Sequence, residues 1–305
     1  MSPEKRATIV ATVVATILTF IKFFIGVASG SVAVLASAID SLLDTLISIF
    51  NFFAIKKSEE KATEDFQYGK GKVQAIAAVI EGTVITISGL YIIYEAIQKA
   101  IHGSKTELLT PAITVMIISI VVTFVLVQYL LKVAKETDNL VIKSDALHYQ
   151  TDLWSNGVIL LALGIVYATG WEWVDALFGF GIGIYIIYSA YEIIEEGIAI
   201  LLDRALEKET VDEIKELIGS HPEVNGFHWL KTRTDGTINF VEFHLVLQPN
   251  MYLIEAHRIS DQIEDKIALL DDKKRWIITP HYDPYDDEDI NNAVAEGKTL
   301  GQVTR

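Results

Sequence analysis

Long apolar runs alternate with short polar connections through the first two hundred residues of the chain. A helix needs about 20 mostly apolar residues to cross a bilayer. Six segments meet that length, at roughly 7–29, 32–56, 73–101, 109–134, 140–168 and 173–200. Only the sequence SGS joins the first two, which requires an antiparallel hairpin. The pattern predicts a membrane α-helical bundle of six transmembrane helices over residues 1–203.

After Asp203 the pattern becomes that of a small soluble domain. KETVDEIKELIGSH and LIEAHRISDQIEDKIALL have helical periodicity, whereas RWIITPHYD is typical of a strand. The segment VNGFHWLKTRTDGTINFVEFHLVLQ predicts two strands around a turn, because Asp-Gly between apolar runs is a hairpin signal. The order αββαβ predicts an α+β domain over residues 204–285. Residues 286–305 are polar and acidic, which predicts a disordered tail.

Lysine and arginine are distributed unevenly among the predicted connections. They gather between the second and third segments and between the fourth and fifth, and they are absent between the first and second and between the fifth and sixth. Cytoplasmic loops carry the excess of basic residues. We therefore expect both termini and the soluble domain to face the cytoplasm. The start, MSPEKRATIV, lacks a small-residue cleavage site, so we interpret it as the beginning of the first helix.

Composition agrees with a membrane protein and narrows its chemistry. Hydrophobic residues make up 51% of the 305, and the chain has no cysteine. Disulfides and thiolate metal sites are therefore excluded, and a metal would be held by His, Asp, Glu or backbone oxygen. The formal net charge of −15 argues against nucleic acid as a partner.

Two pairs of potential metal ligands lie inside predicted spans. Asp40 and Asp44 occur in DSLLDTL of the second segment, and His148 and Asp152 in LHYQTD of the fifth. Residues four apart share one face of a helix. The two segments run in opposite directions, so a rise of about 1.5 Å per residue places Asp44 level with His148 and Asp40 level with Asp152. We expect the four side chains to converge near the bilayer midplane.

One imidazole nitrogen and three carboxylate oxygens suit tetrahedral Zn²⁺. Fe²⁺, Co²⁺ and Cd²⁺ would also fit, because ligand chemistry rarely selects a single divalent ion. Ionised groups at this depth cost a few kcal/mol each on insertion scales, so three acids require a cation or a water-filled cavity. Glu81, Glu95, Asp175 and Lys22 are unpatterned, and we interpret them as interface, cavity or helix-end residues.

These motifs, in six spans followed by an αββαβ domain, resemble the cation diffusion facilitator family, and most closely its bacterial zinc and ferrous-iron efflux subgroup. The resemblance covers roughly residues 7–285. It implies a homodimer in the inner (plasma) membrane of a bacterium that exports divalent cations in exchange for protons. By motif, Asp40, Asp44, His148 and Asp152 would form the transport site. The chain would then be a transporter and not an enzyme.

The resemblance also implies metal in the soluble domain, where the subgroup has a two-zinc site at the dimer interface. The matching residues are His228, His244, His257, His281 and Asp283. Zn²⁺ there would be regulatory or structural. A further match predicts a charge pair between Lys72 and Asp203 that would hold the two halves of the dimer together near the membrane.

One stretch departs from the family pattern. Relatives of this kind often have GHGK in the connection between the second and third spans, with His and Asp ligands around it, whereas this chain has YGKGK. Lys70 replaces the imidazole and repels cations, although Glu64 and Asp65 remain. We expect this loop site to be absent or weakened.

Two other classes of function remain open at this point. A membrane-bound metal sensor or scaffold would bind metal without flux, but it has no need of ligands in the bilayer. An intramembrane metalloenzyme would need an open metal position and a base, and HxxxD lacks the adjacent Glu of HExxH. The physiological metal and the proton stoichiometry do not follow from the sequence.

Overall fold

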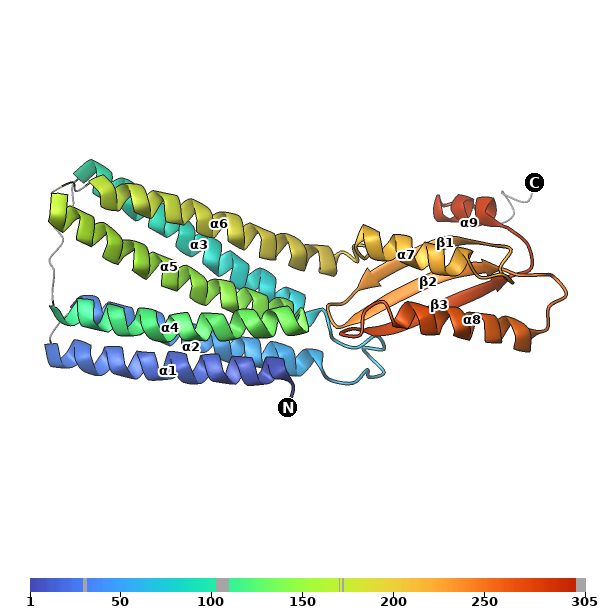
Figure 1. The fold of residues 1–305 in the computed structure, drawn as a ribbon, viewed down its shortest axis with the longest axis horizontal. Coiled ribbons are helices and arrows are strands. Elements are labelled where there is room, and N and C mark those ends of the chain that lie inside the picture. The colour runs from blue at the N-terminus through green and yellow to red at the C-terminus, as the bar shows by residue number, and fades with distance from the viewer. Residues whose placement is uncertain (30–31, 103–109, 170, 172, 300–305) are drawn as a thin grey trace. The chain divides into compact units, whose positions relative to one another are not determined.

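The computed structural model describes residues 1–29, 32–102, 110–169, 171 and 173–299. The chain divides into two compact units, Met1–Ala199 and Ile200–Arg305, close to the boundary expected at residue 203. The first unit is helical (Figure 1). Its elements are α1 (Pro3–Ser29), α2 (Val32–Ser58), α3 (Val73–His102), α4 (Thr110–Thr137), α5 (Leu140–Thr169) and α6 (Trp173–Leu201).

Four of these helices are long and apolar enough to cross a membrane. The qualifying segments are Pro3–Ile25, Val73–Gln98, Val115–Thr137 and Ala176–Leu201. Within the described residues, α2 and α5, which carry the predicted ligand pairs, are not among them. For α5 the sequence gives the reason, because SDALHYQTD makes its first half polar. Six long helices are present, but a count of six spans stays a prediction.

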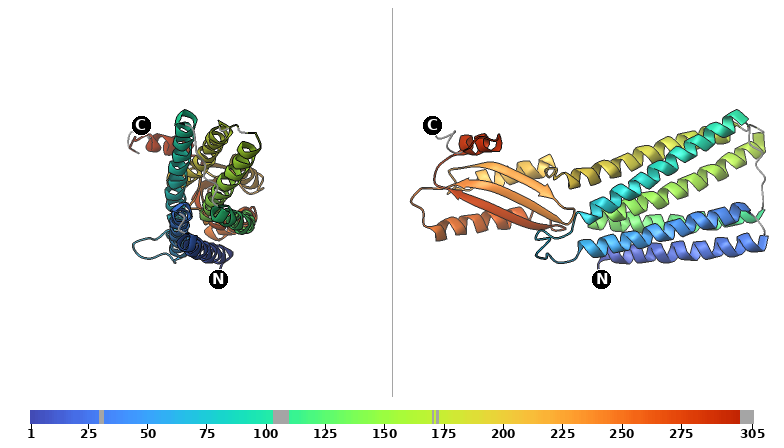
Figure 2. Two further views of the ribbon diagram at one scale, coloured as in Figure 1. Left: turned by 90° about the vertical axis from the view of Figure 1, so that its left-hand side faces the viewer. Right: turned by 180° about the vertical axis from the view of Figure 1, so that it is seen from behind.

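The helices that carry the ligands, α2 and α5, each contact several other helices of the bundle. α1 packs along α2, α4 packs along α5, and α2 and α5 contact each other and α3 (Figure 2). The core uses alanines where helices approach closely: Ala7, Ala11 and Ala15 repeat every four residues along α1 and are buried against larger side chains of α4 and α5. Small residues permit close backbone approach, which drives helix association in membranes.

α3 and α6 lie side by side and meet at glycines (Figure 1). A Cβ atom on Gly183 would lie 3.0 Å from the carbonyl oxygen of Gly89 and 2.5 Å from Cγ1 of Ile93. A Cβ atom on Gly89 would lie 2.8 Å from Cγ1 of Ile187. The separation of these two helices is therefore set by the absence of side chains at the contact.

The second unit has the predicted order αββαβ. It contains α7 (Lys208–Gly219), β1 (Gly226–Thr234), β2 (Ile238–Val246), α8 (Leu253–Ala268) and β3 (Arg275–Asp283). The sheet order is β1-β2-β3, with β1 antiparallel and β3 parallel to β2.

Alternation along β2 separates the two faces of the sheet. Val241, Phe243 and Leu245 are buried against α7 and α8, so His244 points to the opposite face. The predicted turn also forms: the Asp235 carboxylate accepts hydrogen bonds of 2.8 Å from the backbone N–H groups of Thr237 and Ile238. Gly236 adopts φ +95°, a left-handed conformation that favours glycine.

The tail differs from the expectation of disorder over part of its length. Residues Glu288–Ala295 form helix α9, which contacts β1. Glu288 and Asp289 stand in its first turn, where negative charge stabilises a helix N-terminus. Residues 300–305 lie outside the described part of the chain. The acidic run after β3 is therefore a helix start as well as a solubilising segment.

We expect Gly183→Ala to destabilise the helical unit by about 1–3 kcal/mol, the usual effect of overpacking a tight contact. The measurement is the thermal midpoint of the detergent-solubilised protein by size-exclusion chromatography. Gly181→Ala is the matched control, because a Cβ atom there meets nothing within 4 Å. It should be neutral or slightly stabilising, and equal losses for both variants would contradict the packing argument.

Candidate metal centres

α2 and α5 bring an acid and an imidazole into direct contact. Nε2 of His148 lies 3.0 Å from Oδ1 of Asp44. His148 is buried and Asp44 is partly buried. Helix rise predicted that Asp44 and His148 lie at the same depth along their helices, and this contact confirms it. The two residues are 104 positions apart in the sequence.

Asp152 stands one helical turn beyond His148 and completes a group of three. One ligand atom from each of Asp44, His148 and Asp152 lies within 4.8 Å of the other two. Asp40, the fourth predicted ligand, belongs to α2, but its side chain lies outside the described residues. Three of the four predicted side chains are thus brought together, and the role of Asp40 stays a prediction.

The surroundings hold the ligand-bearing helices in register. The hydroxyl groups of Ser48 and Tyr149, each close in sequence to a ligand, are 2.8 Å apart and buried between α2 and α5. On the α1 side, the buried Nζ of Lys22 donates a hydrogen bond of 2.7 Å to Oγ of Ser41. A cation held by these ligands would therefore sit between helices fixed by polar contacts.

The soluble unit places three histidines in one row across the sheet. His228 pairs with His244, and His244 pairs with His281, so the residues occupy equivalent positions on β1, β2 and β3. The ring centroids are 5.0 Å apart for the first pair and 4.5 Å for the second. All three point to the face that does not carry α7 and α8.

A bulge in β1 shapes this row. The register shifts between His228 and Lys231, and Trp229 adopts φ +55°, a left-handed conformation that is costly for a bulky residue. The Trp229 ring packs edge-on to His244 at 5.1 Å between centroids. β-Bulges often redirect side chains next to functional sites, and this bulge lies directly beside the row of histidines.

Two carboxylates bind the histidine row. Nδ1 of His244 lies 2.7 Å from Oδ2 of Asp283, and Nε2 of His228 lies 3.0 Å from Oδ1 of Asp287. One ligand atom from each of these four residues lies within 4.8 Å of the others. His281 stands at the exposed edge, with Nε2 3.3 Å from Oδ1 of Asp283. Two or three imidazoles with two carboxylates form a set that suits Zn²⁺.

Asp287 was missed by the sequence interpretation. It lies in the run PYDDED, which acidic composition assigned to a disordered tail. Asn291 of α9 strengthens the placement, because its Nδ2 donates to Oδ1 of Asp287 at 2.6 Å and lies 3.2 Å from Nε2 of His228. The one available signal was an acid four residues after Asp283.

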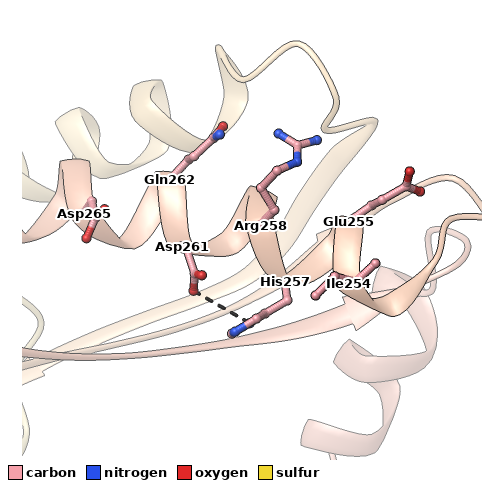
Figure 3. Close-up of a pocket in the computed structure, with 7 residues that line it drawn as sticks. All are labelled: Ile254, Glu255, His257, Arg258, Asp261, Gln262 and Asp265. Atoms are coloured by element: carbon pink, nitrogen blue, oxygen red, sulfur yellow. Dashed lines mark ion pairs between the residues drawn. The ribbon is translucent and has the colours of Figure 1, made fainter.

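His257 does not join this group within one chain. It stands on α8, which packs on the opposite face of the sheet, and its Nδ1 lies 3.7 Å from Oδ1 of Asp261 (Figure 3). Figure 3 shows both side chains at a shallow pocket with Glu255 and Asp265. The expectation that His257 contributes at a dimer interface stays a prediction.

In the connection between α2 and α3, Lys70 forms an ion pair with a nearby glutamate. Nζ of Lys70 lies 2.9 Å from Oε2 of Glu60, and Lys57 also pairs with Glu60. Hydrogen bonds from Lys57 and Lys70 lower the pKa of the Glu60 carboxyl. The ammonium of Lys70 thus neutralises a nearby acid.

The predicted charge pair between Lys72 and Asp203 joins two separate units and stays a prediction. Within the second unit, Nη1 of Arg233 lies 3.3 Å from Oδ1 of Asp203.

Comparison with known proteins covers both units. The family model for the cation efflux transmembrane domain matches residues 8–202, and that for the cytoplasmic domain of cation efflux proteins matches residues 206–285. Similar proteins include the cation-efflux pumps FieF of Citrobacter koseri and Shigella boydii serotype 18. Both are 39% identical to this chain, over 220 and 222 residues, or 72% of this chain and 73% of each relative. The FieF pump of Escherichia coli strain K12 is likewise 39% identical over 222 residues.

We expect Asp287→Asn to weaken Zn²⁺ binding by the soluble unit, because it removes a charge while keeping the shape and the helix-start position. Loss of a ligand or its support costs about 10–100-fold in metal affinity. The measurement is competition between the full-length protein and a chelating dye. Asp289→Asn, an exposed acid in the first turn of α9, is the control. Equal affinities for both variants would remove Asp287 from the site.

Proposed function

The chain belongs to the cation diffusion facilitator family of cation-efflux transporters, and on that premise we propose that it exports Zn²⁺ from the cytoplasm in exchange for protons. Members of this family are transporters and not enzymes. The observation that carries the proposal is the contact between Asp44 and His148, with Asp152 beside it, inside a bundle of long apolar helices.

In the proposed topology all six helices cross the inner membrane of a bacterium. The lysine-rich connections then face the cytoplasm together with both termini and the soluble unit. α5 would cross despite its polar first half, because its acids and imidazole face α2 and not lipid. Intramembrane ionisable residues almost always face the bundle interior and mark ion pathways.

The proposed substrate is Zn²⁺, and Fe²⁺, Cd²⁺ and Co²⁺ are also compatible with the ligand set. An imidazole with carboxylates favours borderline divalent cations over Mg²⁺ and Ca²⁺, which prefer oxygen alone. Asp40 is proposed as the fourth ligand because it lies one turn before Asp44 on α2.

Proton exchange follows from the chemistry of the ligands. Each must be deprotonated to bind a cation, so binding releases protons and protons compete for the same atoms. His148 is the proposed principal proton carrier, because imidazole ordinarily changes charge at physiological pH. The helices would alternate between inward-open and outward-open forms around a nearly fixed site.

The soluble unit is proposed to hold regulatory or structural Zn²⁺ in a homodimer. The matched cytoplasmic-domain family and the exposed edge of the histidine row support this proposal. His281 and Asp283 would connect the row to a second copy, with His257 contributing across the interface. Filled sites would favour one dimer geometry.

A metal sensor without flux is the alternative function. The histidine row alone would serve a sensor as well as a transporter. The group on α2 and α5 favours transport, because ligands buried between membrane helices serve a sensor no purpose.

Purified protein in liposomes should take up Zn²⁺ when a pH gradient is imposed, and Asp44→Asn should reduce the initial rate to near the level of empty liposomes. The reason is loss of a charged ligand from the transport site. Uptake of Zn²⁺, Fe²⁺, Cd²⁺ and Mn²⁺ should be compared. Glu192→Gln, an exposed acid on α6, is the control and should retain flux. Zinc binding without uptake by the unaltered protein would favour the sensor.

His148→Asp should preserve cation binding but change both metal preference and pH dependence. An additional carboxylate shifts preference toward oxygen-preferring ions such as Mn²⁺. It also moves the protonation step to the acidic range typical of carboxyl groups. Initial rates across external pH, measured for Zn²⁺ and Mn²⁺, test both parts. Unchanged selectivity with an unchanged pH profile would exclude His148 from the proposed roles.

A further inference from the structure

A second polar cluster lies buried between α2, α3 and α5, separate from the transport ligands. Nδ2 of Asn51 donates hydrogen bonds to Oε2 of Glu81 at 3.0 Å and to Oδ1 of Asp145 at 3.3 Å. The exposed fraction is 0% for Asn51, 2% for Glu81 and 0% for Asp145. We call Glu81 and Asp145 the bridged acid pair.

Three of the five carboxylate and amide oxygen atoms in this cluster have no hydrogen-bond partner among the described residues. They are Oε1 of Glu81, Oδ2 of Asp145 and Oδ1 of Asn51. Oγ of Ser144 is also buried without a hydrogen bond of normal geometry, although it lies close enough to interact with the Glu81 carboxylate. An unpaired buried polar group costs about 1–3 kcal/mol, and a charged one costs more. Such oxygen atoms are satisfied either by protons on the carboxyl groups or by a bound cation.

The cluster lies on the route between the transport ligands and one end of the helices. Asp145 precedes His148 by about one turn of α5, and Asn51 follows Asp44 by about two turns of α2. Ser48, which bonds Tyr149, lies between Asp44 and Asn51 along α2. In the proposed topology this end faces the cytoplasm, from which the exported ion enters.

We propose that Glu81, Asp145 and Asn51 form a second divalent-cation site, on the cytoplasmic side of the transport ligands. Two carboxylates balance the charge of one divalent cation. A half-turn of the Asn51 amide exchanges its donating Nδ2 for its accepting Oδ1, which then becomes a third ligand. Ser144 offers a fourth oxygen.

The ligand chemistry distinguishes this site from the transport site. It contains oxygen atoms and no imidazole, so it suits an oxygen-preferring ion such as Mn²⁺ better than Zn²⁺. The inference depends on the proposed function only for the position of this site on the path by which the ion enters from the cytoplasm. Cation binding at the bridged acid pair is a separate property that can be measured without flux.

The test counts bound Mn²⁺ in full-length protein reconstituted in lipid nanodiscs, by loss of the free Mn²⁺ signal in electron paramagnetic resonance. All arms carry Asp44→Asn and His148→Ala, which disable the transport site, and all retain the soluble unit. One arm adds Glu81→Gln with Asp145→Asn, a second adds Glu81→Gln alone, and a control adds Glu95→Gln. Glu95 is a carboxylate on the same helix outside the cluster. Size-exclusion chromatography and circular dichroism compare the folding of all arms.

The double change should remove one bound Mn²⁺ per chain, the single change should weaken that binding by roughly tenfold or more, and Glu95→Gln should change neither. Equal Mn²⁺ counts in all folded arms would overturn the proposal and indicate that the bridged acid pair holds protons only. If the double variant does not fold, the single isosteric variant decides, and unaltered affinity there overturns the proposal. Because the transport site is disabled throughout, failure here leaves the proposed function untouched.

Discussion

The contact between Asp44 and His148 is the constraint on which the helical unit depends. Ionisable groups in a bilayer are costly, so they must face each other or a cation. In this structure they face each other across α2 and α5, 3.0 Å apart. That requirement places α2 and α5 next to each other, and the alanines of α1 pack against larger side chains of α4 and α5 beside them. The cost of exposing ionisable groups to lipid therefore explains both the apolar surface of the bundle and the polar contacts between its helices.

In the soluble unit, a β-sheet brings the potential metal ligands together. One face is apolar and carries α7 and α8, so the other face is free to gather imidazoles. Register alone aligns His228, His244 and His281 on three strands. The start of helix α9 then brings Asp287 to His228, at the β1 end of that row. The site therefore depends on strand pairing and on the segment after β3, and no short sequence motif contains it.

The sequence predicted features that follow from local spacing. The αββαβ order and the facing levels of Asp44 and His148 are confirmed, because helix rise and periodicity are local properties. Asp287 was missed, because acidic composition predicts disorder unless the pairing with His228 is known. Glu81 was interpreted as an isolated residue, since its partners Asn51 and Asp145 lie on two other helices. Contacts between distant segments depend on packing, which a single sequence does not encode in its spacing.

The central claim is that ligands from α2 and α5 together hold one divalent cation inside the bundle. X-ray absorption at the zinc edge tests it most directly, in full-length protein whose soluble site has been removed by His228→Ala and His244→Ala. The account predicts one nitrogen and three oxygen ligands at about 2.0–2.1 Å, with the nitrogen lost in His148→Asp. A shell with no imidazole nitrogen in the parent protein, or one that His148→Asp leaves unchanged, would contradict it.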